Sequence, residues 1–164
     1  MYSREMKFCP GCKNACPVGH FNCPMGKKYL DSYNASLEHE QVEKYSCSRA
    51  YDLVVLVNLD TGEEEHFKQV GMFRKLKAEM EGLDYFERST YYLDHCVAPE
   101  DRAIFLELSD RENIVRAMEA GEEYAINYHV IYNGESASME TRFFPYKTSD
   151  PSRPHMTIKT VKRI

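Results

Sequence analysis

The sequence of 164 residues lacks the segments and motifs that mark several large classes of protein. It has no G-x-S-x-G nucleophile motif, no phosphate-binding P-loop, and no kinase or cyclase signature. The purest aliphatic run, Leu53 to Val57, is too short to span a bilayer, and the first residues lead into cysteines instead of the apolar stretch of a signal peptide. We therefore expect a cytoplasmic protein that is not an enzyme.

An excess of positive charge is also absent. The net charge is -5 and the isoelectric point is near 5.7, whereas binding to nucleic acid or to an anionic membrane favours a basic face. Residues 1–28 differ, because five basic residues and one acidic residue give them a charge of +4, which leaves -9 for the remainder. We expect no nucleic-acid or membrane partner, and we predict three parts: 1–27, 28–47 and 48–164.

Four of the six cysteines crowd into the first part, in the order Cys9, Cys12, Cys16, His20 and Cys23 with one histidine among them. Clustered thiols in a reducing compartment are more typical of a metal site than of disulfides. The run resembles short bacterial cysteine-rich segments of the form C-x2-C-K-N-x-C-P with one further cysteine. That resemblance implies Cys9, Cys12, Cys16 and Cys23 as the ligands.

The identity of the metal is open between two alternatives. Zinc is the first expectation, because sites of four cysteines are a common structural solution and so short a segment has little core without metal. An iron–sulfur cluster is the alternative, since closely spaced cysteines followed by proline also occur in ferredoxin-type loops, and it would make the segment a redox or oxygen sensor. Unliganded thiols, one of them catalysing redox exchange, are the remaining interpretation.

Residues 28–47 predict a linker helix with a thin apolar stripe, because its less polar residues recur about one helical turn apart. The residues of the stripe are Leu30, Tyr33, Leu37, Gln41 and Tyr45. The stripe either packs on the domain that follows, which we take as the first expectation, or pairs with its copy in a homodimer.

The third part predicts two strands, several short helices and then three strands, with turns at Asp60-Thr-Gly62 and Asn133-Gly134. The predicted strands are 51–58, 63–70, 124–132, 136–144 and 156–161. The predicted helices are 72–83 with Gly82 at its end, one that opens at Ala98-Pro99 and stops by Ser109, and one from a Ser109–Glu112 capping box to Gly121, with short helical or irregular segments over 84–96. This order favours an α+β fold: a five-stranded antiparallel sheet with short helices on one face.

Three stretches share their order and spacing with a known family: YDLVVLVNLDTGEEE, APEDRAIFLELSDRENIVRAMEAGEEYAINYHVIYNGE, and the closing hairpin strand. Over residues 48–164 they resemble the PAS domains of bacterial sensor kinases and diguanylate cyclases. The resemblance implies a PAS-like fold that senses small ligands or cofactors between sheet and helices, or dimerises, and relays the result to an output protein such as a kinase or cyclase. We expect that output from a partner or from a segment beyond Ile164.

A ligand pocket of this fold would take its lining from two helices and one strand. The candidates are Phe73, Leu76, Met80, Phe105 and Tyr128. The same residues are what a core requires, so an interaction module with a filled pocket and a purely structural zinc is the alternative. Nothing in the sequence identifies a ligand.

Other reactive side chains favour structural roles. Cys96 lies in Asp94-His-Cys-Val-Ala, which lacks the asparagine-cysteine-arginine signature of flavin-binding PAS relatives, so we interpret it as a structural cysteine. His95 has no evident haem pocket around it. The remaining histidines of this part, His66, His129 and His155, are too scattered to predict a metal site.

Overall fold

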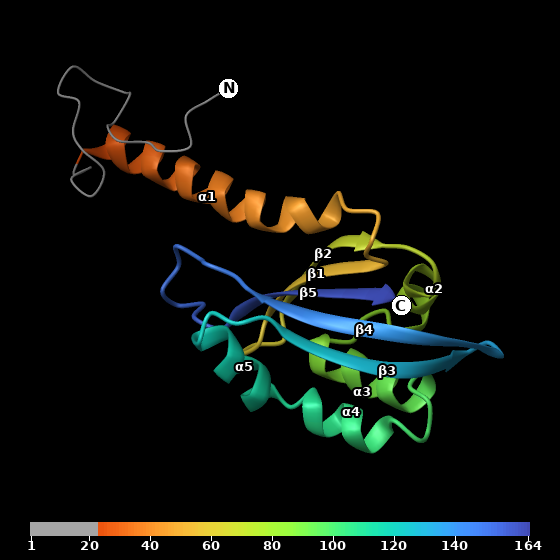
Figure 1. Ribbon diagram of the computed structural model, residues 1–164. Coiled ribbons are helices and arrows are strands. Elements are labelled where there is room, and N and C mark those ends of the chain that lie inside the picture. The colour runs from red at the N-terminus through yellow and green to blue at the C-terminus, as the bar shows by residue number, and fades with distance from the viewer. Residues whose placement is uncertain (1–22) are drawn as a thin grey trace. The chain divides into compact units, whose positions relative to one another are not determined.

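A computed structural model of the protein describes residues 23–164 (Figure 1). Two compact units, residues 1–41 and 42–164, divide the chain. The helices are α1 (Pro24–Ser46), α2 (Met72–Glu79), α3 (Tyr85–His95), α4 (Arg102–Leu108) and α5 (Arg111–Glu119). The strands are β1 (Leu53–Asn58), β2 (Glu64–Gln69), β3 (Tyr124–Tyr132), β4 (Glu135–Pro145) and β5 (Met156–Arg163).

One antiparallel sheet organises the second unit, with its described strands in the order β2-β1-β5-β4-β3. The last strand in the sequence, β5, is therefore the central one. The chain leaves one edge at β2, passes through α2 to α5 on one face of the sheet, and returns at the opposite edge as β3 (Figure 1). The α+β class, the five antiparallel strands and the helices on one face are confirmed, and this arrangement is consistent with the PAS-like fold that the resemblance implies.

Strand β1 is buried on both faces, which explains its continuous apolar sequence. Leu53, Val55 and Val57 face the helices and join the larger core. Val54 and Leu56 face the opposite side and join a smaller core. At β1, both faces of the sheet are therefore covered.

The last turn of α1 belongs to the second unit and contributes to this smaller core. Val42 is 1% exposed there, and the ring of Tyr45 stacks on Phe144 with their centroids 4.3 Å apart. Packing of the helix on its own domain is therefore confirmed for this turn. The helix begins at Pro24, four residues before the predicted start at residue 28.

Helix α3 spans eleven residues where we predicted short helical or irregular segments. It begins with a capping box, in which the Asp84 carboxylate accepts a hydrogen bond from the Glu87 backbone N–H at 2.9 Å and the Glu87 carboxylate accepts one from the Asp84 N–H at 3.0 Å. The helical alternative of that prediction is therefore the one observed, and the Asp-x-x-Glu pattern marks the first turn of the helix.

Replacing Asp84 with alanine is expected to lower the free energy of unfolding by about 1 kcal/mol, because the backbone N–H of Glu87 loses its side-chain acceptor. The matched control is Asp94→Ala, which removes an exposed carboxylate near the other end of the same helix. Urea unfolding followed by circular dichroism measures both. Equal effects of the two substitutions would show that the cap contributes nothing.

Three further helix boundaries differ from the predicted ones. Helix α2 ends at Glu79, before Gly82, and its C-cap residue is Met80. Helix α4 begins at Arg102 instead of Pro99, because the Ala98 N–H donates to the His129 carbonyl and holds this stretch against β3. The cap of α5 is Asp110, whose carboxylate accepts from the Glu112 N–H at 2.9 Å. Ser109 cannot fill that role, since it is the C-cap of α4.

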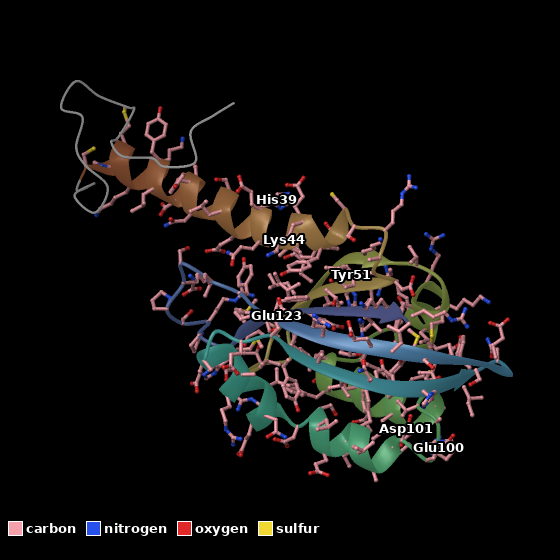
Figure 2. The ribbon with its side chains drawn as sticks, in the orientation of Figure 1. His39, Lys44, Tyr51, Glu100, Asp101 and Glu123 are labelled. Carbon is pink, nitrogen blue, oxygen red and sulfur yellow. The ribbon has the colours of Figure 1, made fainter. Side chains whose placement is uncertain are left out.

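Asp101 and Arg102, at the start of α4, join this helix to its neighbours. Asp101 is labelled in Figure 2. Asp101 accepts hydrogen bonds from the backbone N–H of His129 at 2.7 Å and from its Nδ1 at 2.8 Å. The backbone bond first, and then the side-chain bond, lower the pKa of Asp101. Arg102 donates to the carbonyls of Val97 and Asp94. The Pro-Glu-Asp-Arg motif therefore fixes α3, α4 and β3 together.

The turn between β3 and β4 has the predicted type. Asn133 and Gly134 both have positive φ, 52° and 80°, as the two central positions of a type I′ turn require.

Within the described residues, no helix combines the length and the apolar composition needed to cross a bilayer.

Candidate functional site

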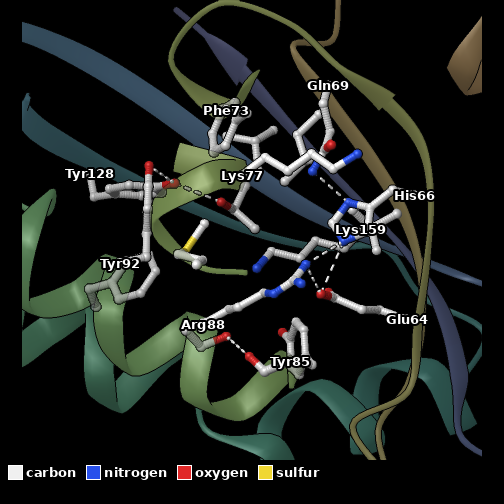
Figure 3. A pocket seen from close by; sticks show the side chains of 17 residues that line it. Glu64, His66, Gln69, Phe73, Lys77, Tyr85, Arg88, Tyr92, Tyr128 and Lys159 are labelled. Atoms are coloured by element: carbon white, nitrogen blue, oxygen red, sulfur yellow. Dashed lines mark hydrogen bonds and ion pairs between the residues drawn. The ribbon is translucent and has the colours of Figure 1, made fainter. Parts of the chain in front are cut away.

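A cavity of about 60 Å³, which we name the charged cavity, opens between the sheet and the helices of the second unit (Figure 3). Its walls come from β1, β2, β4, β5, α2, α3 and α4, with Tyr128 added from β3. One end is polar and contains Glu64, His66 and Arg88, whereas the other end is formed by the rings of Tyr92 and Tyr128. Such a mixture is unusual inside a core, where charged groups are costly.

A network of hydrogen bonds and ion pairs holds the polar end. The Glu64 carboxylate forms ion pairs with Arg88 Nη1 and with His66 Nε2, the latter at 3.0 Å. His66 Nδ1 lies 2.9 Å from Gln69 Nε2, and its Nε2 lies 2.8 Å from Arg88 Nη1. Edge strand β2 and helix α3 are therefore joined by charge at this end of the cavity.

The carboxylate of Glu64 stays ionised in this setting. Burial raises its pKa, but the hydrogen bond with His66 and the charges of His66, Arg88 and Lys159 outweigh burial and hold the pKa below its ordinary value. Charged residues in the lining are Glu64, Lys77, Arg88 and Lys159. Three cations thus accompany one carboxylate among these residues, a surplus of two positive charges.

A chain of hydroxyl groups spans the aromatic end. The hydroxyl of Tyr128 lies 2.8 Å from Thr141 Oγ1 and 3.2 Å from the hydroxyl of Tyr92. Burial is the main reason why the pKa of Tyr128 rises to about 12 and the pKa of Tyr92 rises well above its ordinary value. Both phenols are neutral hydrogen-bonding groups at physiological pH.

A second space of about 300 Å³, the apolar cavity, lies between α3, α4, α5 and the sheet. It is lined largely by aromatic and aliphatic side chains, with Leu59, Ile114 and Ile126 among them. Its volume is at the lower end of the range, about 300–1,000 Å³, of sites for small organic ligands. The two cavities share one wall, formed by Tyr85, Ser89, Tyr92, Phe105, Thr141 and Lys159.

Lys159 is the only charged residue in the lining of both cavities among the described residues. It lies on the central strand β5, between Val55 on β1 and Phe143 on β4, and it faces the helices. Its ammonium nitrogen lies 4.9 Å from the centroid of the Tyr85 ring. Within the part of the chain that the structure describes, no salt bridge or hydrogen bond involves that ammonium group.

The structure brings together four of the five pocket residues predicted from the sequence. Phe73, Met80, Phe105 and Tyr128 all line the charged cavity. Leu76 does not line either cavity, because it is 0% exposed and fills the core behind them. Whether a ligand binds at these residues stays a prediction.

Sequence reasoning missed the polar lining altogether. Glu64 and His66 lie on β2 and Arg88 lies on α3. The contact between these two elements was not predicted. Lys159 carried a usable signal, since a lysine with Ile158 before it and Thr160 and Val161 after it interrupts a buried strand.

The cysteines have separate environments. Cys96 is 1% exposed at the end of α3, and burial raises its pKa to about 12, which fits the structural role we predicted. Cys9, Cys12 and Cys16 lie outside the described residues. Cys23 is exposed immediately before α1, and its Sγ accepts a hydrogen bond from the Gly26 N–H at 3.2 Å. From residue 23 onward, no group of three or more His, Cys, Asp or Glu side chains is arranged to hold a metal ion.

Comparison with known proteins yields little. No family model matches the chain, and no curated relative is found. Among solved structures, the chain is similar to one from a study of a fungal LOV domain photoreceptor, with 15% sequence identity and a TM-score of 0.39. That match covers 68% of this chain and 74% of the other.

Proposed function

We propose that residues 42–164 form a signal-sensing module that binds a small molecule between its sheet and its helices. The observation that carries this proposal is the pair of adjoining cavities, whose shared wall joins an apolar space to a charged one. Cavities of this kind, apolar with a few convergent polar groups, are the usual form of small-molecule sites. The PAS-like fold adds support, because the family resemblance implies a ligand in this layer.

The energetics of the charged cavity support binding over simple packing. Ionised groups inside a core are costly, and an apolar replacement of similar volume is often neutral or stabilising. A cavity maintained beside charged groups loses further dispersion contacts. An interaction module with a filled pocket requires neither the ionised groups nor the open cavity, so we place that alternative second.

Relay of the signal belongs to the same proposal. Binding between the helices and β5 would alter the packing of α3 on the sheet, and a partner such as a kinase or cyclase would read this change by protein contact. A homodimer is compatible with this relay. That the chain catalyses no reaction of its own, and that it is cytoplasmic, stay predictions.

A thermal-shift screen of small metabolites tests the proposed function. A ligand that binds only the folded state raises the free energy of unfolding by about 2.7 kcal/mol when its concentration is one hundred times its Kd. The melting temperature rises with ligand concentration accordingly. At least one compound should show this saturable effect. Ser89→Trp should abolish it, because the larger side chain would occupy the space where the two cavities meet. A library without a single saturable hit would favour the interaction module.

A second proposal concerns the N-terminal segment, which we propose binds zinc, or alternatively an iron–sulfur cluster, through Cys9, Cys12, Cys16 and Cys23. The supporting observation is the exposed thiol of Cys23 with its N–H···S hydrogen bond, since backbone donors to sulfur stabilise the thiolate that a metal requires.

Purification without oxygen, followed by elemental analysis and a visible spectrum, should find about one zinc per chain, or iron with sulfide. Cys23→Ser should lower the metal content, whereas Cys47→Ser, which removes another exposed cysteine, should not. Neither metal in the wild-type protein would end this proposal.

A further inference from the structure

We infer that the ligand of the shared cavities is a small aromatic carboxylic acid, whose acidic group binds the ammonium of Lys159 while its ring occupies the apolar cavity. This inference rests on the proposed function and names the chemical class of its ligand.

The position of Lys159 is the first reason. A lysine at the centre of a sheet, with Val55 and Phe143 as its neighbours on the adjacent strands, loses part of its hydration, and its ammonium forms no salt bridge and acts on the Glu64 carboxylate only at longer range. The Tyr85 ring at 4.9 Å offsets only part of this cost, since a cation–π contact is worth about 0.5–2 kcal/mol. An acidic ligand group would supply the missing partner.

The charge of the surroundings is the second reason. The carboxylate of Glu64 contacts Arg88 and His66, and no salt bridge joins it to Lys159, whose charge lowers the pKa of Glu64 only from a longer distance. Arg88 Nε is buried and has no hydrogen-bond acceptor among the described residues. An anion beside Lys159 would reduce the surplus of positive charge and add an acceptor near this donor.

The apolar cavity determines what shape the rest of the ligand can have. Beyond Lys159, the apolar cavity of about 300 Å³ is bounded by the rings of Tyr85, Tyr92 and Phe105. Aromatic walls favour a flat, apolar body in offset or edge-to-face contact. Ser89 and Thr141 also lie in the shared wall, but the Ser89 hydroxyl donates to the Tyr85 carbonyl and the Thr141 hydroxyl pairs with Tyr128, which leaves the ammonium of Lys159 as the donor for the acid.

Matched probes separate charge from shape. Phenylacetate and phenylacetamide differ in the acidic group alone, as do indole-3-acetate and indole-3-acetamide. We expect the acids to raise the melting temperature of the wild-type protein and to bind more tightly than their amides in calorimetric titrations. Lys159→Met should weaken binding of the acids by about 10-fold or more and that of the amides much less, because only the acids form an ion pair with the ammonium.

Two internal controls accompany this comparison. Arg74→Met removes one positive charge from the exposed face of α2, outside both cavities, and should not affect either probe. Lys159→Met should also raise the melting temperature of the ligand-free protein, because it removes a half-buried ammonium that forms no salt bridge. A lower melting temperature would show that Lys159 stabilises the fold, which would count against a binding role.

The outcomes distinguish the inference from the proposed function. Equal binding of acids and amides, or equal weakening of both by Lys159→Met, would overturn the acidic ligand and leave a sensing cavity in place. Failure of all four probes, alongside saturable hits for uncharged compounds in the metabolite screen, would do the same. Failure of the probes and of the whole screen would overturn both.

Discussion

Replacing Glu64 with alanine is expected to lower the free energy of unfolding by about 3 kcal/mol, because the substitution leaves Arg88 largely buried without its ion-pair partner. The side chain of Glu64 is only 11% exposed, so solvent screens this pair weakly. Glu65→Ala, which removes an exposed carboxylate from the next position of β2, is the matched control and should cost well below 1 kcal/mol. Urea unfolding at pH 7 measures both variants.

The same substitution should flatten the dependence of stability on pH. The pKa of Glu64 is lower in the folded protein than its ordinary value of 4.5, so its contribution is complete above that value and is lost as pH falls through the folded-state pKa. Between pH 7 and pH 3 the wild-type protein should therefore lose more stability than Glu64→Ala. Parallel curves for the two proteins would show that Glu64 is not held by the network.

Phe143→Ala is expected to destabilise the protein by about 3–5 kcal/mol, because it removes a large side chain from the centre of the core. Phe143 is 1% exposed on β4, faces the helices and adjoins the apolar cavity, so the space it leaves cannot close easily. Phe86→Ala removes a ring that is 38% exposed on α3 and should cost less than half as much. Similar losses, measured by calorimetry, would contradict the assignment of the core.

The order of elements was readable from the sequence because strand patterns and turn residues act locally. The aliphatic run of β1 and the Asn133-Gly134 turn each specify their structure within a few residues, and both were confirmed. The bounds of helix α3 were not predicted, because most of its apolar residues are aromatic and they are irregularly spaced. Its Asp84-x-x-Glu87 box, a local signal, would have placed its first turn.

The candidate site was predictable only in its apolar half. Helical periodicity indicated that Phe73 and Met80 face the core, and both line the charged cavity. Leu76 followed the same period yet lies behind the cavity, since periodicity gives the face of a helix but not the depth of each side chain. The ion pair of Arg88 with Glu64 joins positions 24 residues apart on different elements, so it depends on tertiary packing that the sequence pattern does not contain.

Titration of the isotopically labelled protein with the best compound of the metabolite screen, followed by amide NMR, tests the central claim most directly. The account predicts saturable shift changes concentrated on α3, β4 and β5, around Ser89, Thr141 and Lys159, which border both cavities. Changes centred instead on the opposite face of the sheet, near Val54 and Phe144, would contradict binding between the sheet and its helices.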